Sequence, residues 1–119
     1  MATLTVVETA GFGGGATDVG YETAAGGGDE FQNTGKEFVI IDNADASPTT
    51  VSAAVQANAQ SLNVSGITKD VTVPATTTGM MGPFDTRYYN DSNGRVQLTY
   101  TSVTSLNVAV VRIVEPFGR

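Results

Sequence analysis

The sequence lacks the residue types on which many small enzymes and metal sites depend. Its 119 residues include no histidine, no cysteine and no tryptophan, and only four are leucine. Without histidine there is no Ser-His-Asp triad or imidazole proton shuttle, and without cysteine there is no thiol nucleophile, disulfide or thiolate zinc site. We therefore expect a protein that is not an enzyme and that holds neither a metal ion nor a cofactor.

Long apolar runs are also missing. The longest fully apolar runs are short, such as residues 38–41 and 108–111, and the first residues show no basic region followed by an apolar stretch. A helix that spans a membrane needs about 20 predominantly apolar residues in succession. The sequence predicts neither a membrane span nor a secretion signal.

Positive charge is scarce, and the negative charge is concentrated in one part of the chain. Six basic residues stand against 12 acidic ones, and the first 45 residues hold eight of the acids with a single lysine. Such an acidic segment repels the phosphates of nucleic acids, and the near-neutral remainder has no basic cluster with interleaved aromatic residues. We expect no direct binding to nucleic acid.

What the sequence does contain favours β-structure. Valine, isoleucine and threonine together make 36 of the 119 residues, and their stiff, branched side chains fit a pleated sheet better than a helix. A chain of this length is expected to form one domain. About seven short strands and no convincing helix favour an all-β fold, either a small β-sandwich or a jelly-roll-like barrel.

The individual strands differ in how clearly the pattern defines them. Residues 95–101 alternate strictly, which places Val96, Leu98 and Tyr100 inward, and a strand at residues 88–89 is expected to pair with them across the turn at 90–94. Residues 37–41 are apolar on both faces and predict a buried, central strand. Further expected elements are a strand or short helix at 49–57, strands at 70–74 and 106–114, and an exposed turn at 76–79.

Glycine separates the N-terminal region from the rest. Eight of the 14 glycines lie between Gly11 and Gly28, and residues 11–16 formally match a dinucleotide-binding pattern without the helix that this pattern needs. We interpret residues 1–30 as an extended, acidic arm and residues 31–119 as the β domain. The arm includes a short β-prone segment at residues 4–7, which is expected to pair with a sheet of its own chain or of a neighbouring copy.

Three groups of oxygen-bearing side chains have a structural and a functional interpretation. Residues 42–45 and 90–93 hold clustered Asp and Asn, but neither has the spacing of a calcium-binding EF-hand loop, and both compositions are typical of turns. The adjacent carboxylates Asp29 and Glu30 follow a glycine-rich segment rather than a rigid site. We expect solvation, or salt bridges to a basic partner surface, instead of acid–base catalysis.

Residues 28–38, GDEFQNTGKEF, begin a stretch of the chain that resembles a known family. This segment has an Asp-x-Phe-x-Asn-x-Gly-x-x-Phe arrangement, and an Ala-Ser turn, a Thr-Val strand and the pieces VPA, GPF, YND, GRVQLTY and VAVVR follow in order. The order and spacing resemble small virion proteins of tailed bacteriophages over about residues 28–114. The resemblance implies a capsid decoration (cement) protein or a related head protein, with no catalytic residues to carry over.

The resemblance also implies partners and a location. The protein is expected on the capsid surface of the virion after synthesis in the host cytoplasm, bound to the major capsid protein and self-associated as a homotrimer. The glycine-rich arm lies outside the resemblance, and our separate hypothesis is that residues 1–30 reach across to the capsid protein. The candidate interface residues are Leu4, Val6, Phe12, Phe31, Phe84, Tyr88 and Tyr89. For the four aromatic residues after position 30, the sequence does not separate an interface position from a core position.

Two alternatives stay open at this point. One is a head-to-tail connector or tail-associated subunit, which would be present in far fewer copies per particle than a decoration protein. The other is a carbohydrate-binding module for adhesion to a host, with tyrosines stacked on a sugar. The absence of tryptophan, whose large ring makes it a frequent sugar platform, weighs against this second alternative.

Overall fold

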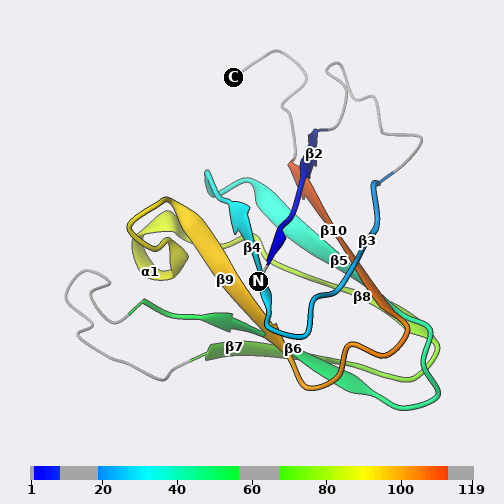
Figure 1. The fold of residues 1–119 in the computed structure, drawn as a ribbon. Coiled ribbons are helices and arrows are strands. Elements are labelled where there is room, and N and C mark those ends of the chain that lie inside the picture. Colours follow the sequence, from blue (N-terminus) through cyan, green and yellow to red (C-terminus); the bar gives the residue numbers. More distant parts are fainter. Residues whose placement is uncertain (1, 9–18, 57–67, 113–119) are drawn as a thin grey trace.

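The computed structural model describes residues 2–8, 19–56 and 68–112, and these residues form an all-β fold of two packed sheets (Figure 1). The elements are β1 (Ala2–Thr3), β2 (Val6–Glu8), β3 (Glu22–Thr23), β4 (Asp29–Gln32), β5 (Glu37–Asn43), β6 (Thr49–Ala54), β7 (Thr68–Val73), β8 (Thr77–Met81), α1 (Thr86–Tyr89), β9 (Arg95–Tyr100) and β10 (Leu106–Arg112). The all-β class predicted from the sequence is confirmed, and the architecture is a small β-sandwich.

Each sheet combines antiparallel pairs with one parallel pair. The first sheet has the order β1-β4-β9-β6-β7, and the second has the order β2-β10-β5-β8. The parallel pairs are β1 with β4 and β2 with β10, and β3 pairs antiparallel with β10 on Asn107 and Val108. The longest pairing joins β5 and β10 over all seven residues of each strand. These two strands form the centre of the second sheet.

The core lies between the sheets and follows the period-two alternation of the strands. In β5, Val39 and Ile41 are fully buried, and in β9, Val96 and Leu98 are fully buried. The predicted inward positions of β9 are therefore confirmed. β10, which follows β9 in the chain, lies in the other sheet and packs against the same core. Phe31 of β4 is fully buried among these side chains. Alternation places every second residue of each strand on an outer face of the sandwich instead.

Two local predictions are corrected. The predicted strand at Tyr88 and Tyr89 is wrong, because these residues belong to α1, where the Asp85 carboxylate caps the helix by accepting a 2.8 Å hydrogen bond from the Arg87 backbone N–H. The turn expected at 76–79 is confined to residues 75–76. The following residues form β8, which pairs with β5. Residues 49–54 adopt the strand rather than the helix alternative.

The N-terminal residues belong to the sandwich. Strands β1 and β2 pair with β4 and β10 of the same chain. The β-prone segment therefore pairs with its own chain, which was one of the two arrangements expected from the sequence. Leu4 between them is 4% exposed and lies in the core. The boundary expected at residue 30 falls inside β4. Residues 9–18, which include Phe12 and the formal dinucleotide pattern, lie outside the described residues.

Candidate interaction surfaces

Most of the side chains predicted at an interface are placed inside the sandwich. Leu4, Phe31 and Phe84 are at most 4% exposed, so they stabilise the fold and present no surface to a partner. Val6 and Tyr89 are partly buried and pack against the core. The structure thus assigns a core position to Phe31 and Phe84, for which the sequence left core and interface open, and it places Leu4 in the core as well.

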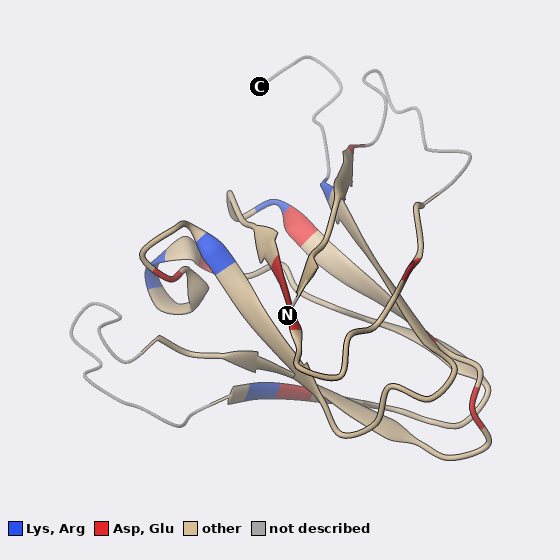
Figure 2. Cartoon of the chain, viewed as in Figure 1, with Lys and Arg blue, Asp and Glu red and all other residues tan. Residues whose placement is uncertain are grey.

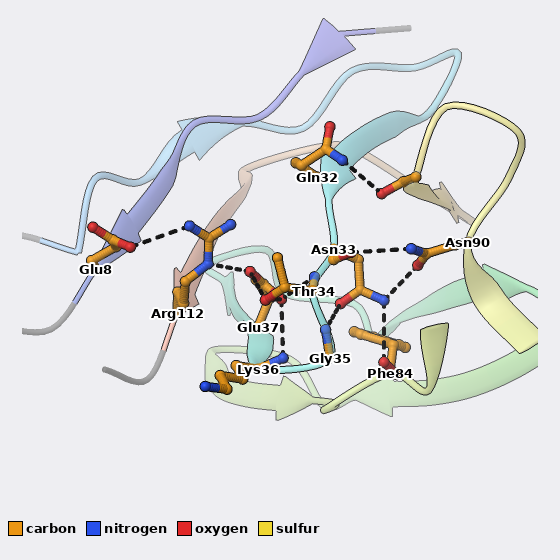
Figure 3. Close-up of polar contacts among 11 residues, drawn as sticks. Glu8, Gln32, Asn33, Thr34, Gly35, Lys36, Glu37, Phe84, Asn90 and Arg112 are labelled. Carbon is orange, nitrogen blue, oxygen red and sulfur yellow. Dashed lines mark hydrogen bonds and ion pairs between the residues drawn. The ribbon is translucent and has the colours of Figure 1, made fainter. Parts of the chain in front are cut away.

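An aromatic and amide cluster holds the α1 corner in place. The rings of Phe31 and Phe84 have centroids 5.7 Å apart, and Tyr89 meets Phe84 edge-on at 5.3 Å. The Asn33 side-chain amide donates to the Phe84 carbonyl at 3.1 Å and to Asn90 Oδ1 at 2.7 Å, and Asn90 donates back to the Asn33 carbonyl (Figure 3). These contacts fix α1 and the chain before it against β4.

A shallow pocket adjoins this corner. It has a volume of about 410 Å³ and is lined by Thr34, Gly35 and residues 83–86. The polar groups at its wall already have partners, because the Thr34 hydroxyl donates to Glu37 and the Asp85 carboxylate pairs with Arg87 at 2.9 Å. Tyr88, which is partly exposed, lies under the Arg87 guanidinium at 5.2 Å. The pocket therefore presents no free acid or base for chemistry.

An ion cluster around one buried carboxylate ties the N-terminal strand β2 to the two central strands of the second sheet. Arg112 of β10 donates to the fully buried Glu37 and, at 3.2 Å, to Glu8 of β2 (Figure 3). Burial alone raises the pKa of Glu37, but hydrogen bonds from the Thr34 backbone and side chain and from Arg112 outweigh it, so the pKa lies below its usual value. The cluster is structural, because each of its charged groups has a partner within the chain.

The adjacent carboxylates Asp29 and Glu30 are also used within the chain. Asp29 is fully buried and accepts a 2.6 Å hydrogen bond from the Tyr100 hydroxyl. Glu30 on the outer side of β4 accepts from Arg95 at 2.8 Å and Gln97 at 2.9 Å, and these hydrogen bonds help to lower the pKa of Glu30. Glu30 thus forms a salt bridge with Arg95 of the same sheet, whereas Asp29 is hydrogen-bonded to a neutral tyrosine.

The turn interpretation of the clustered Asp and Asn residues is confirmed. Asn43 Oδ1 accepts from the Asp45 backbone N–H at 3.1 Å, and Asp91 Oδ1 accepts from the backbone N–H groups of Asn93 and Arg95 at 2.8 and 3.0 Å. These are the local bonds by which such side chains stabilise turns. Among the described residues, no group of three or more acidic side chains is placed to hold a metal ion.

The outer face of the first sheet is polar, and its side chains bond to one another. We call it the polar face. Thr50 and Thr72 share a 3.0 Å hydrogen bond across β6 and β7, and Glu30 bonds to three neighbours on its own face. The outward residues of its four longer strands are Glu30, Gln32, Thr50, Ser52, Ala54, Thr68, Asp70, Thr72, Arg95, Gln97 and Thr99. Only one of them, Ala54, is apolar.

The outer face of the second sheet is apolar. We call it the apolar face, and its members are Val7, Phe38, Ile40, Met80, Ala109 and Val111. Among them Met80 is exposed and Val7, Phe38 and Ile40 are partly exposed, whereas Ala109 and Val111 are at most 4% exposed. The ladders place Val7, Val111 and Phe38 in one row and Ala109, Ile40 and Met80 in the next. Met80 is 63% exposed, and Figure 2 shows that charges on β5 and β10 are confined to the strand ends. The sequence analysis missed this surface, although the apolar residues on both faces of 37–41 were its signal.

Comparison with family models, with curated proteins and with solved structures finds no match. In the part of the chain that the structure describes, no helix has the length and apolar character needed to cross a membrane.

Proposed function

We propose that this chain is a virion structural protein of the capsid decoration type, which binds the outer surface of the major capsid shell and stabilises it without catalysis. The observation that carries the proposal is the contrast between the two outer faces. One face is polar with internally bonded side chains, and the other carries the exposed Met80 beside the partly exposed Ile40 and Phe38. Contiguous apolar surface on a small protein marks a site of contact with another macromolecule.

The two faces suit a module that covers a surface. Burying apolar area contributes about 25 cal/mol per Å², so the apolar face gains free energy when a partner removes it from water. The polar face gains nothing from such contact, because its side chains already bond to one another or to water. The protein would therefore lie with the apolar face against the shell and the polar face toward the solvent.

The resemblance of residues 28–114 to virion proteins of tailed phages supports the shell as the partner. A connector or tail-associated subunit would use the same face within a ring and would be present in far fewer copies. Quantitative mass spectrometry of purified particles separates the two assignments through the ratio of this chain to the major capsid protein. The homotrimer stays a prediction, which sedimentation equilibrium of the purified protein tests.

The direct experiment uses shells from a phage genome that lacks the gene for this chain. Purified protein is added to these shells, and bound protein and the shell melting temperature are measured. Met80→Asp places a charge on the apolar face and is expected to weaken binding at least tenfold, because an unpaired carboxylate would be buried. Thr72→Asp adds the same charge to the polar face and is expected to bind like the wild type. Equal binding by both variants would contradict the proposed face.

A further inference from the structure

The apolar face has one acidic end. Asp42 lies on β5 between the inward Ile41 and Asn43, so its side chain is on the outer side of the second sheet. The ladders place it in a row with Asn107 of β10 and Thr78 of β8, directly beyond the row that ends in Met80. A carboxylate therefore borders the apolar face at the side where Met80 is exposed.

Asp42 has no cation as a partner within the described residues. The ion pairs found there join Arg87, Arg95 and Arg112 to other acids, and none includes Asp42. Its side chain accepts one long hydrogen bond of 3.4 Å from the Thr78 hydroxyl. The carboxylate is partly exposed, so water satisfies it in the free protein.

Tyr21 adds an aromatic ring to the same end. It precedes β3, and it is 43% exposed. β3 pairs with β10 so that Thr23 lies opposite Asn107, which is itself opposite Asp42, and this register brings Tyr21 to the end of the face that holds Asp42. Partial burial and, secondly, the negative charge of Asp42 raise the pKa of the Tyr21 hydroxyl, in agreement with this placement. Within the described residues, Tyr21 and Met80 are the two exposed large hydrophobic side chains. An exposed ring beside an unpaired carboxylate is a receptor for a cation that can also stack.

We propose that the apolar face binds a basic and apolar strip of the shell protein, with an arginine of that strip held between the Tyr21 ring and the Asp42 carboxylate. The inference rests on the proposed function and names the chemistry of its partner. A planar guanidinium donates two parallel hydrogen bonds to a carboxylate and stacks on an aromatic ring, which an ammonium group does less well. The flexible, exposed Met80 adapts to apolar residues next to that arginine.

Charge argues for a basic partner rather than a second copy of this face. The members of the apolar face, with Asp42 and Tyr21, include no lysine or arginine, and the whole chain carries a net charge of -6. Pairing of two such faces would supply no cation to Asp42. A shell surface with exposed basic residues both neutralises the carboxylate and accelerates the encounter with an acidic protein.

The test compares Asp42→Asn with Asp70→Asn on shells from the gene-deleted phage. Both variants remove one negative charge and keep the side-chain shape, but Asp70 lies on the polar face. Asp42→Asn is expected to weaken binding about tenfold in low salt and to flatten the salt dependence of the dissociation constant. Asp70→Asn is expected to bind like the wild type with the salt dependence unchanged. Melting temperatures of both variants establish that they are folded.

A second pair isolates the ring. Tyr21→Phe keeps the stacking surface and is expected to retain binding, whereas Tyr21→Ala is expected to lose about fivefold or more. If the wild type binds shells and Asp42→Asn binds equally well at every salt concentration, the arginine site is wrong and the proposed function stands. If the wild type does not bind shells at all, the proposed function fails, and this inference fails with it. Sedimentation equilibrium that showed dimers dissociated by Met80→Asp would assign the face to a second copy instead.

Discussion

Glu37 carries a charge into the interior of the sandwich, and the surrounding residues compensate for the loss of water. Its carboxylate accepts hydrogen bonds from the Thr34 backbone N–H at 2.7 Å, from the Thr34 hydroxyl and from the Arg112 guanidinium. A buried carboxylate is tolerated only with such partners, and removal of one member leaves the others unpaired. The pKa of Glu37 is lowered, so its charged form stabilises the folded protein.

Substitution Glu37→Gln is therefore expected to lower the free energy of unfolding by about 2 kcal/mol at pH 7. Because the pKa of Glu37 is lower in the folded chain than in the unfolded chain, its contribution is complete above the unfolded pKa and is lost as the pH falls through the folded pKa. The variant should accordingly lose less stability than the wild type on acidification. Urea unfolding over a pH series measures both effects.

Glu8→Gln is the matched control, because the Glu8 side chain is 57% exposed and also contacts Arg112. Its loss is expected to stay below about 0.5 kcal/mol, as for an exposed ion pair. Equal losses from the two glutamine variants would show that burial of Glu37 contributes nothing to the cluster.

For individual residues, the sequence predicted local turn roles better than contacts between residues that lie far apart in the chain. Asn43 and Asp91 were assigned to turns from their composition, and their bonds are local. Asp29 and Glu30 were expected to face solvent or a partner, but their hydrogen-bond partners Tyr100 and Arg95 are 71 and 65 residues away. Only the strand register brings such groups together, so no local pattern indicates these contacts.

The secondary-structure elements were predictable where alternation or apolar character is strong. Strands β5, β9 and β10 agree with the predicted segments within the described residues. β8 was missed because its Thr and Gly residues have the composition of a turn and become a strand by pairing with β5. α1 was missed because a four-residue helix has no periodicity, and the Asp85 cap and the packing of Phe84 on Tyr89 stabilise it.

The N-terminal strands β1 and β2 are expected to contribute to the stability of the sandwich. Leu4 connects β1 and β2 and is 4% exposed, with its backbone N–H donating to the Glu30 carbonyl at 2.8 Å. Leu4→Ala is expected to lower the free energy of unfolding by about 2 kcal/mol or more, because it removes apolar contacts between the sheets and leaves a cavity. Thermal and urea unfolding of the purified variant provide the measurement.

The exposed neighbour Thr5 supplies the control for this prediction. Thr5→Ala is expected to change stability by less than about 0.5 kcal/mol. If Leu4→Ala were as stable as Thr5→Ala, residues 2–8 would behave as a separate arm that contributes nothing to the sandwich. A large difference would mean that residues 2–8 are needed for the fold. Shell binding should then be tested with substitutions of surface residues, because a deletion of residues 2–8 would also damage the fold.

For the whole molecule, composition describes an average over two unlike faces. The net charge of -6 and the excess of Val and Thr do not show that apolar residues gather on one outer surface and polar residues on the other. That contrast depends on register, which places Phe38 opposite Val111 and Ile40 opposite both Ala109 and Met80. The sequence indicated strands that are apolar on both faces, but it could not indicate which of them stay uncovered.

The orientation on the shell can be measured with the two adjacent methionines of β8. Met80 is 63% exposed on the apolar face, and Met81 is 4% exposed in the core. Dilute hydrogen peroxide should oxidise Met80 in the free protein and spare Met81, because thioether oxidation follows exposure. On shells, Met80 oxidation is expected to slow by about tenfold, as a covered side chain loses contact with the reagent. Mass spectrometry of proteolytic peptides gives both rates in one sample, and Met81 is the internal control for unfolding. Met80 oxidation at the same rate in the free and the bound protein would place the apolar face away from the shell.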